Sequence, residues 1–179
     1  MTCSNLSSWS APYYRPEPRA SFRLFCFPYA GGGASVFARW RTRSAPETDI
    51  FPVQLPGREN RISEPVPLAV RELAAQATEA LKPMFDQKFA LFGHSLGALV
   101  AYEIARNLQR AGQRMPERLI ASGHRAPTVL CPHKPTWDLP DSEFRRRVSE
   151  LNGTPKEVFD HPRTSSARHS ALAGRFSSR

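Results

Sequence analysis

The sequence predicts an α/β fold in which a mostly parallel sheet carries helices on both faces. Short apolar runs typical of buried strands alternate with longer segments whose apolar residues recur at helical spacing. The composition, 40% hydrophobic and 23% charged residues, is that of a globular domain. No apolar stretch approaches the length needed to cross a membrane, so we expect no membrane partner.

The predicted elements follow one another in regular order. Apolar runs bounded by turn residues predict strands over 22–29, 49–56, 88–94 and 118–124. Helical spacing predicts helices over 35–45, 68–85, 96–111 and 139–151.

Changes in composition divide the chain into segments. Residues 1–21 are expected to be an irregular lead-in without a signal-peptide pattern, and residues 22–125 to form the α/β core. A Pro-rich stretch follows within 126–160, and residues 161–179, rich in serine and arginine, are expected to form a disordered tail. The composition changes abruptly near residue 162, which suggests a truncated chain. We therefore expect an incomplete fold that lacks its late strands.

The formal net charge of +9 includes four arginines within 163–179. No nucleic-acid-binding motif accompanies this charge, so we expect an acidic protein partner and no nucleic acid. Cys3, Cys26 and Cys131 are isolated from one another, which indicates free thiols in a cytoplasmic protein. We expect no metal and no cofactor.

Ser95 is the candidate catalytic residue. It lies in GHSLG (93–97), which fits the pattern G-x-S-x-G of a nucleophile elbow, between an apolar strand and an amphipathic helix. Gly93 and Gly97 meet an expected requirement for glycine at these two positions, because a side chain at either one would collide in so tight a turn. The serine hydroxyl would then stand clear at the carboxyl edge of the sheet.

A glycine-rich loop follows the first predicted strand, in PYAGGGA (28–34). Gly31 and Gly32 would let the backbone approach a substrate closely. The N–H groups of Ala30 and Leu96 would then form an oxyanion hole for a tetrahedral intermediate.

Five blocks of the sequence resemble type II thioesterases of polyketide and nonribosomal peptide synthesis, which are similar to medium-chain acyl carrier protein hydrolases. They are FCFPYAGGGASVFARW, VQLPGREN, LFGHSLGALVAYEIA, LIASGHRAP and LNGTPKEV. The resemblance implies an α/β-hydrolase that cleaves acyl groups from the phosphopantetheine arm of a carrier protein, with Ser95 as nucleophile and Ala30 and Leu96 as oxyanion-hole residues. It also implies that 126–160 is a helical lid, and we expect the chain to act as a monomer.

A serine hydroxyl needs a histidine and a carboxylate to activate it, and in this fold both follow the serine in the chain. We expect this chain to lack the positions that the family uses for them, which would leave its catalytic triad incomplete. His94 is expected to point away from Ser95, and His124 and His133 to lie in loops. The downstream residues that could substitute are His161, His169, Asp138, Asp141 and Asp160.

Other interpretations remain open. The chain could be a non-catalytic remnant that binds carrier proteins, or another acyl hydrolase or acyltransferase with a GHS elbow.

Overall fold

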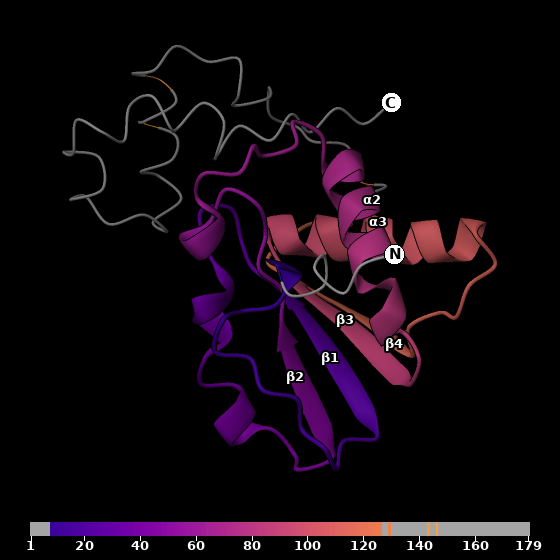
Figure 1. Ribbon diagram of the computed structural model, residues 1–179. Helices are drawn as coiled ribbons and strands as arrows, with labels where there is room; N and C mark the ends of the chain where they lie inside the picture. Colours follow the sequence, from indigo (N-terminus) through magenta and orange to yellow (C-terminus); the bar gives the residue numbers. More distant parts are fainter. Residues whose placement is uncertain (1–7, 127–128, 130–142, 144–145, 147–179) are drawn as a thin grey trace.

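The computed structural model describes residues 8–126, 129, 143 and 146. Within them, four parallel strands form one sheet in the order β2-β1-β3-β4 (Figure 1). The strands are β1 (Phe22–Phe27), β2 (Thr48–Pro52), β3 (Lys88–His94) and β4 (Arg118–Ser122). The predicted parallel α/β architecture is confirmed.

The strand order reverses direction between β1 and β3. From β1 the chain moves to β2 on one side, then crosses back to β3 on the other side of β1 and continues outward to β4. In open parallel sheets, ligands bind outside the carboxyl ends of the strands at such a switch point. The segments that follow β1 and β3 therefore lie where a site is expected.

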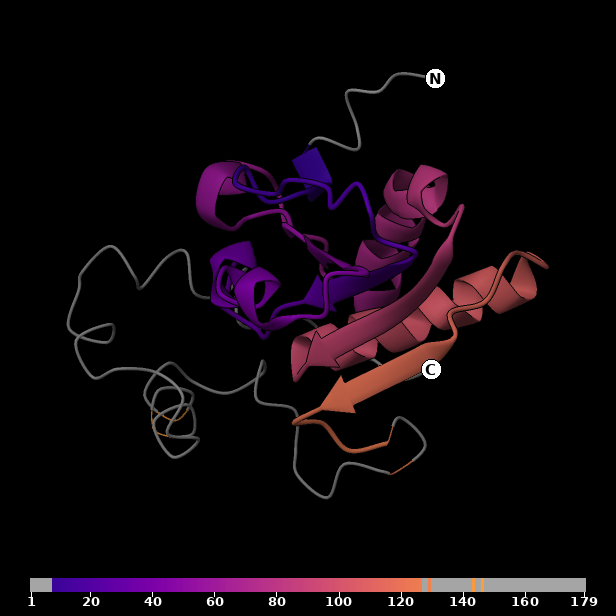
Figure 2. The ribbon, with the colours of Figure 1, turned by 90° about the horizontal axis from the view of Figure 1, so that it is seen from below.

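One face of the sheet is covered by two α-helices, α2 (Val70–Leu81) and α3 (Leu96–Arg110). Figure 2 shows α3 running beside β3 and β4. The strands present aromatic side chains to this face, among them the fully buried Phe25, Phe27 and Phe89. Each such ring removes a large apolar area from water, which makes this layer the main core of the described residues.

The opposite face is covered by shorter helical turns, η1 (Ala34–Phe37) and η2 (Arg41–Arg43). An α-helix over 35–45 is therefore the wrong prediction; the segment forms two 3₁₀ turns. The rings of Phe37 and Trp40 both pack against Phe92, with centroids 6.0 and 4.8 Å away. These two anchors are three residues apart, which matches the three residues per turn of a 3₁₀ helix.

The other elements predicted within the described residues agree with the structure apart from their ends, and the helix predicted over 139–151 lies outside those residues apart from 143 and 146. The strand predicted over 88–94 is β3, whereas β2 ends at Pro52, before the predicted limit of 56. The helix predicted over 68–85 is α2 followed by η4 (Lys82–Met84), and η3 (Glu59–Arg61) lies in the loop after β2. The lid and tail predicted for 126–160 and 161–179 lie outside the described residues, apart from 126, 129, 143 and 146.

The segment that begins at Ser8, part of the predicted irregular lead-in, packs onto the sheet. Trp9 is buried, and Gln54 N–H donates to its carbonyl at 2.8 Å. The Tyr14 hydroxyl donates to the buried carboxylate of Asp49 at 2.8 Å, and Arg23 forms an ion pair with the same oxygen at 2.8 Å. These contacts fix the segment against the edge strand β2.

No helix in the described part of the chain is long and apolar enough to cross a membrane.

Candidate active site

Ser95 occupies the bend between β3 and α3, beside the switch point. Its backbone has φ 53° and ψ −112°, a conformation that L-residues rarely adopt. The Ser95 N–H donates to the carbonyl of Ser122 at 2.8 Å, and its own carbonyl accepts from Ala98 N–H at 3.0 Å. Strain of this kind persists where the surroundings over-determine it, and it clusters at functional sites.

The two glycines of the elbow are required by close backbone packing. A Cβ on Gly93 would lie 2.0 Å from the Gly97 carbonyl oxygen. A Cβ on Gly97 would lie 2.1 Å from the carbonyl oxygen of Phe27 and 2.8 Å from that of Pro28. The start of α3 therefore rests directly on the end of β1.

The first turn of α3 supplies backbone donors next to Ser95. The initial N–H groups of an α-helix have no acceptor within the helix, and the helix dipole adds partial positive charge there. Leu96 is the first residue of α3, and no hydrogen bond from its N–H is found among the described residues. This N–H is free to meet negative charge on a bound group.

The glycine loop begins with a turn over residues 29–32. Gly32 N–H donates to the Tyr29 carbonyl at 3.0 Å, and Gly31 has φ 85°, which identifies a turn that needs glycine at its third position. In the described residues no acceptor contacts the Ala30 N–H. Since Gly97 packs on Phe27 and Pro28, the turn starts beside the N-terminus of α3.

Tyr29 and His94 join the loop to the elbow. Their rings meet edge to face with centroids 5.9 Å apart, and Tyr29 also covers Gly32. His94 Nδ1 lies 3.0 Å from the Ser122 hydroxyl oxygen. His94 is thus engaged by Tyr29 and Ser122, and no contact with the Ser95 hydroxyl is found in the described residues. Sequence reasoning missed Ser122, which is the last residue of the exposed strand β4 and carries no motif.

Of the other histidines and the downstream residues predicted as substitutes for a triad, only His124 lies in the part of the chain that the structure describes. His124 Nδ1 contacts the carbonyl of Arg125 at 2.7 Å, in a loop as expected. The others, His133, His161, His169, Asp138, Asp141 and Asp160, lie outside the described residues.

Cys26 does not compete with Ser95 as a nucleophile. It is fully buried within β1, and burial raises the pKa of its thiol, so the reactive thiolate is not formed near neutral pH. The described residues also contain no cluster of three or more histidine, cysteine, aspartate or glutamate side chains that could hold a metal. The site of interest is therefore the serine elbow and the loop beside it.

The arrangement is suited to acyl transfer. A hydroxyl at a helix N-terminus can attack a carbonyl carbon, while two neighbouring N–H groups donate hydrogen bonds to the carbonyl oxygen and stabilise the negative charge that develops on it.

Comparisons with known proteins agree with this chemistry. Residues 22–176 match the thioesterase domain family. The chain is 42% identical over 142 residues to the linear gramicidin dehydrogenase LgrE of Brevibacillus parabrevis, covering 79% of this chain and 54% of that protein. It is 41% identical over 142 residues to the thioesterase PikA5 of Streptomyces venezuelae, covering 79% and 50%.

A solved structure shows the same fold. RedJ, a thioesterase from the prodiginine biosynthetic pathway in Streptomyces coelicolor, superimposes with a TM-score of 0.78 and 36% identity, covering 92% of this chain and 66% of that one. The chain spans about half the length of the curated relatives that it matches.

Proposed function

The chain belongs to the thioesterase domain family, and from this premise we propose that it hydrolyses acyl thioesters held on the phosphopantetheine arm of carrier proteins. The pathways served would be those of polyketide or nonribosomal peptide antibiotics, in which the enzyme would remove or release acyl groups. One observation carries the proposal: a strained serine at the sheet switch point, between a helix N-terminus and a glycine turn.

The proposed reaction has two steps. The Ser95 hydroxyl oxygen bonds to the thioester carbon while its proton passes to a general base, and the N–H groups of Ala30 and Leu96 hold the resulting oxyanion. The carbon–sulfur bond then breaks, the phosphopantetheine thiol leaves with a proton, and an acyl ester on Ser95 remains. Water attacks this ester, which gives the free acid and restores the serine.

The general base is the part of the mechanism with no assigned residue. The family resemblance implies an aspartate and a histidine that follow Ser95 in the chain. His161 and His169 are the histidines nearest the C-terminal end and the first to test. Replacing the base should reduce turnover strongly while leaving substrate binding intact.

The proposed partner is an acyl or peptidyl carrier protein. Carrier proteins of this kind are acidic, and the formal charge of +9 on this chain would steer them toward it. The phosphopantetheine belongs to the carrier, so this chain would need no cofactor of its own. We propose that it acts as a monomer in the cytoplasm.

The test is hydrolysis of an acyl carrier protein loaded with a radiolabelled acyl group. We expect release of the acid by the wild-type chain and loss of at least 100-fold in rate for Ser95→Ala. Ser44→Ala is the matched control, because Ser44 precedes β2 at the opposite, amino edge of the sheet and should leave the rate unchanged.

Equal rates in the wild-type chain and Ser95→Ala would overturn the proposal. Binding of the carrier without any hydrolysis would instead favour a non-catalytic carrier-binding module.

A further inference from the structure

The segment that follows β2, residues 54–61, holds the far end of the glycine loop. The loop itself offers few means of staying in place, since its glycines have no side chains to pack. Ala34, the last residue of the loop, and Ser35, which follows it in η1, contact two side chains from this segment, Gln54 and Glu59.

Gln54 is completely buried and uses both ends of its amide. Its Oε1 accepts from the Ala34 N–H at 3.0 Å, and its Nε2 donates to the Arg58 carbonyl at 2.8 Å. One partner is a backbone donor and the other is a backbone acceptor, so only one orientation of the side-chain amide forms both hydrogen bonds. Gln54 thus ties the glycine loop to the segment after β2 through a fixed bridge.

Glu59 contacts Ser35, the residue that directly follows the loop. Its Oε1 accepts from the Ser35 N–H at 3.2 Å and from the Ser35 hydroxyl. A Cβ on Gly33 would lie 2.2 Å from this oxygen, so the carboxylate lies directly against the glycine backbone. Glu59 has φ 45°, a strained value for a residue with a side chain, which the surrounding contacts maintain.

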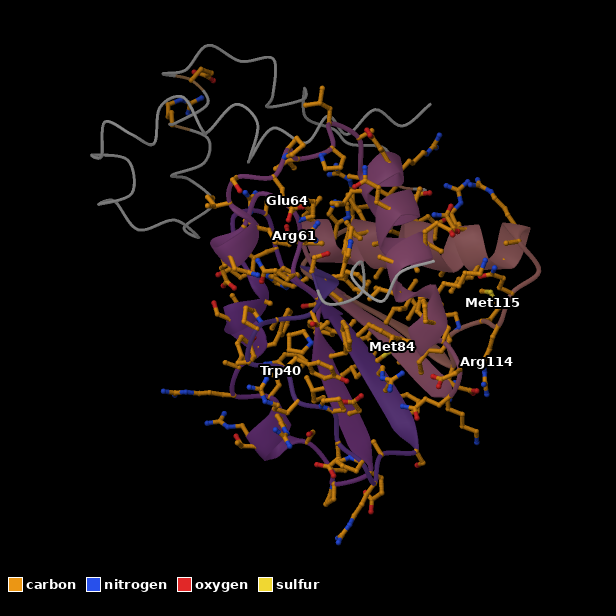
Figure 3. All side chains as sticks on the ribbon, viewed as in Figure 1. Trp40, Arg61, Glu64, Met84, Arg114 and Met115 are labelled. Carbon is orange, nitrogen blue, oxygen red and sulfur yellow. The ribbon has the colours of Figure 1, made fainter. Side chains whose placement is uncertain are left out.

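The segment is itself anchored to the core. Arg61 donates to the Gln54 carbonyl at 2.9 Å, and its guanidinium lies 4.7 Å from the centre of the buried Trp9 ring. Glu64 pairs with Arg61 through two contacts, at 2.6 and 2.9 Å, and Figure 3 shows these two side chains together beyond the carboxyl ends of β1 and β2. Gln54 and Glu59 therefore reach the loop from a rigid base.

We propose that Gln54 and Glu59 are positioning residues for the oxyanion hole: by fixing Ala34 and Ser35, they hold the Ala30 N–H where it can meet the carbonyl oxygen of an acyl group at Ser95. This inference rests on the proposed function. It assigns a role to the VQLPGREN block, which contacts the loop rather than the nucleophile. Because the oxyanion forms only in the transition state, loosening the loop should slow catalysis without weakening substrate binding.

The test compares Glu59→Ala with Glu59→Gln in the full chain. Glutamine keeps an Oε1 acceptor for Ser35, whereas alanine removes it. We expect kcat for thioester hydrolysis to fall about 10-fold or more in Glu59→Ala, with KM within about twofold of wild type, and to recover to within about threefold in Glu59→Gln. Glu47→Ala, an exposed change at the amino edge, should alter neither constant.

A second measurement does not depend on turnover. Amide hydrogen exchange in the peptide covering 28–36 should be faster in Glu59→Ala than in wild type, and close to wild type in Glu59→Gln. A Glu59→Ala variant with unchanged kcat, or with a raised KM and normal kcat, would overturn the inference.

If the wild-type chain hydrolyses no thioester, the proposed function fails, and exchange alone then decides the loop's attachment. Unchanged exchange in Glu59→Ala would overturn that attachment too.

Discussion

The two halves of the candidate site are held in different ways. The serine elbow is fixed by backbone against backbone: Gly93 lies against Gly97, and Gly97 lies against Phe27, with no room for a Cβ at either glycine. The glycine loop is fixed by side chains that arrive from other segments, namely Gln54 and Glu59. The Tyr13 hydroxyl adds a further hydrogen bond, to the Ala34 carbonyl.

This difference separates two kinds of vulnerability. The elbow should tolerate almost no change in its glycines, since nothing flexible can move aside. The loop should lose stability in smaller steps as its supporting side chains are removed, because each of them contributes one or two hydrogen bonds. Substitutions in the two halves should therefore differ in the size of their effects.

Gly97→Ala should have the largest effect on stability. The new Cβ would meet the Phe27 carbonyl oxygen at 2.1 Å, and both backbones are held in the sheet and helix. We expect the free energy of unfolding to fall by about 3 kcal/mol or more, measured by urea denaturation. Gly112→Ala is the control: it has φ 59° but nothing within 4 Å, so it should cost only about 1 kcal/mol. Equal losses would show that backbone packing does not set the elbow.

Gln54→Leu should have the next largest effect. It leaves the buried Ala34 N–H without its acceptor and removes one of the two hydrogen bonds to the Arg58 carbonyl, which still accepts from the Arg61 N–H at 2.8 Å, so the free energy of unfolding should fall by about 2 kcal/mol. The measurement is again urea denaturation, with the exposed Gln109→Leu as the matched control, for which we expect a change below about 0.5 kcal/mol. A loss above that of Gly97→Ala would reverse the proposed contrast.

Replacing Ser95 should separate the strain of the elbow from its chemistry. Both Ser95→Gly and Ser95→Ala remove the hydroxyl, but only glycine adopts φ 53° without steric cost. We expect Ser95→Gly to unfold with a free energy about 1 kcal/mol higher than Ser95→Ala, and both to be inactive. Thermal denaturation of the two variants side by side provides the measurement. Identical stabilities would show that the elbow stores no strain.

Acid should weaken the ion pair between Arg61 and Glu64, which belongs to the segment that supports the loop. Hydrogen bonds from Arg61 lower the pKa of Glu64 below its ordinary value of 4.5. A carboxyl group whose pKa is lowered in the folded state stabilises that state at pH values above the pKa of the unfolded chain. This contribution is lost as the pH falls through the pKa of the folded state. We expect wild type to be slightly more stable than Glu64→Gln at pH 7, by less than about 1 kcal/mol, because the pair is partly exposed.

The difference between wild type and Glu64→Gln should vanish in acid, below the folded pKa. Urea denaturation at a series of pH values follows it. A difference that grows as the pH falls would contradict the assignment of this ion pair.

The contrast also explains what could be predicted from the sequence. The contact between Gly93 and Gly97 is local, so the pattern G-x-S-x-G between a strand and a helix was enough to predict it, whereas the contact of Gly97 with Phe27 joins segments far apart in the chain. The turn of the glycine loop was visible for the same reason. Its supports were not, because Gln54 lies 20 residues from Ala34 along the chain, and its hydrogen bond depends on how β1 and β2 pair.

Other differences have equally physical causes. Trp9 and Tyr14 precede the first strand in a stretch without periodicity, yet tertiary contacts with Gln54 and Asp49 bring them into the core. The spacing of Phe37 and Trp40 fitted an α-helix, but the segment forms two short 3₁₀ turns, and both rings pack against Phe92. Sequence patterns thus predicted the features that depend on residues close together in the chain. They did not predict the features that depend on contacts between distant segments.

The central claim is that Ser95 forms the covalent bond to the acyl group. The direct measurement is intact-protein and peptide mass spectrometry after rapid mixing with an acyl phosphopantetheine thioester and acid quench. We predict one added acyl group on the wild-type chain, located on the peptide that contains Ser95 and absent from Ser95→Ala. A folded wild-type protein without this adduct, or an adduct that persists in Ser95→Ala, would contradict the account.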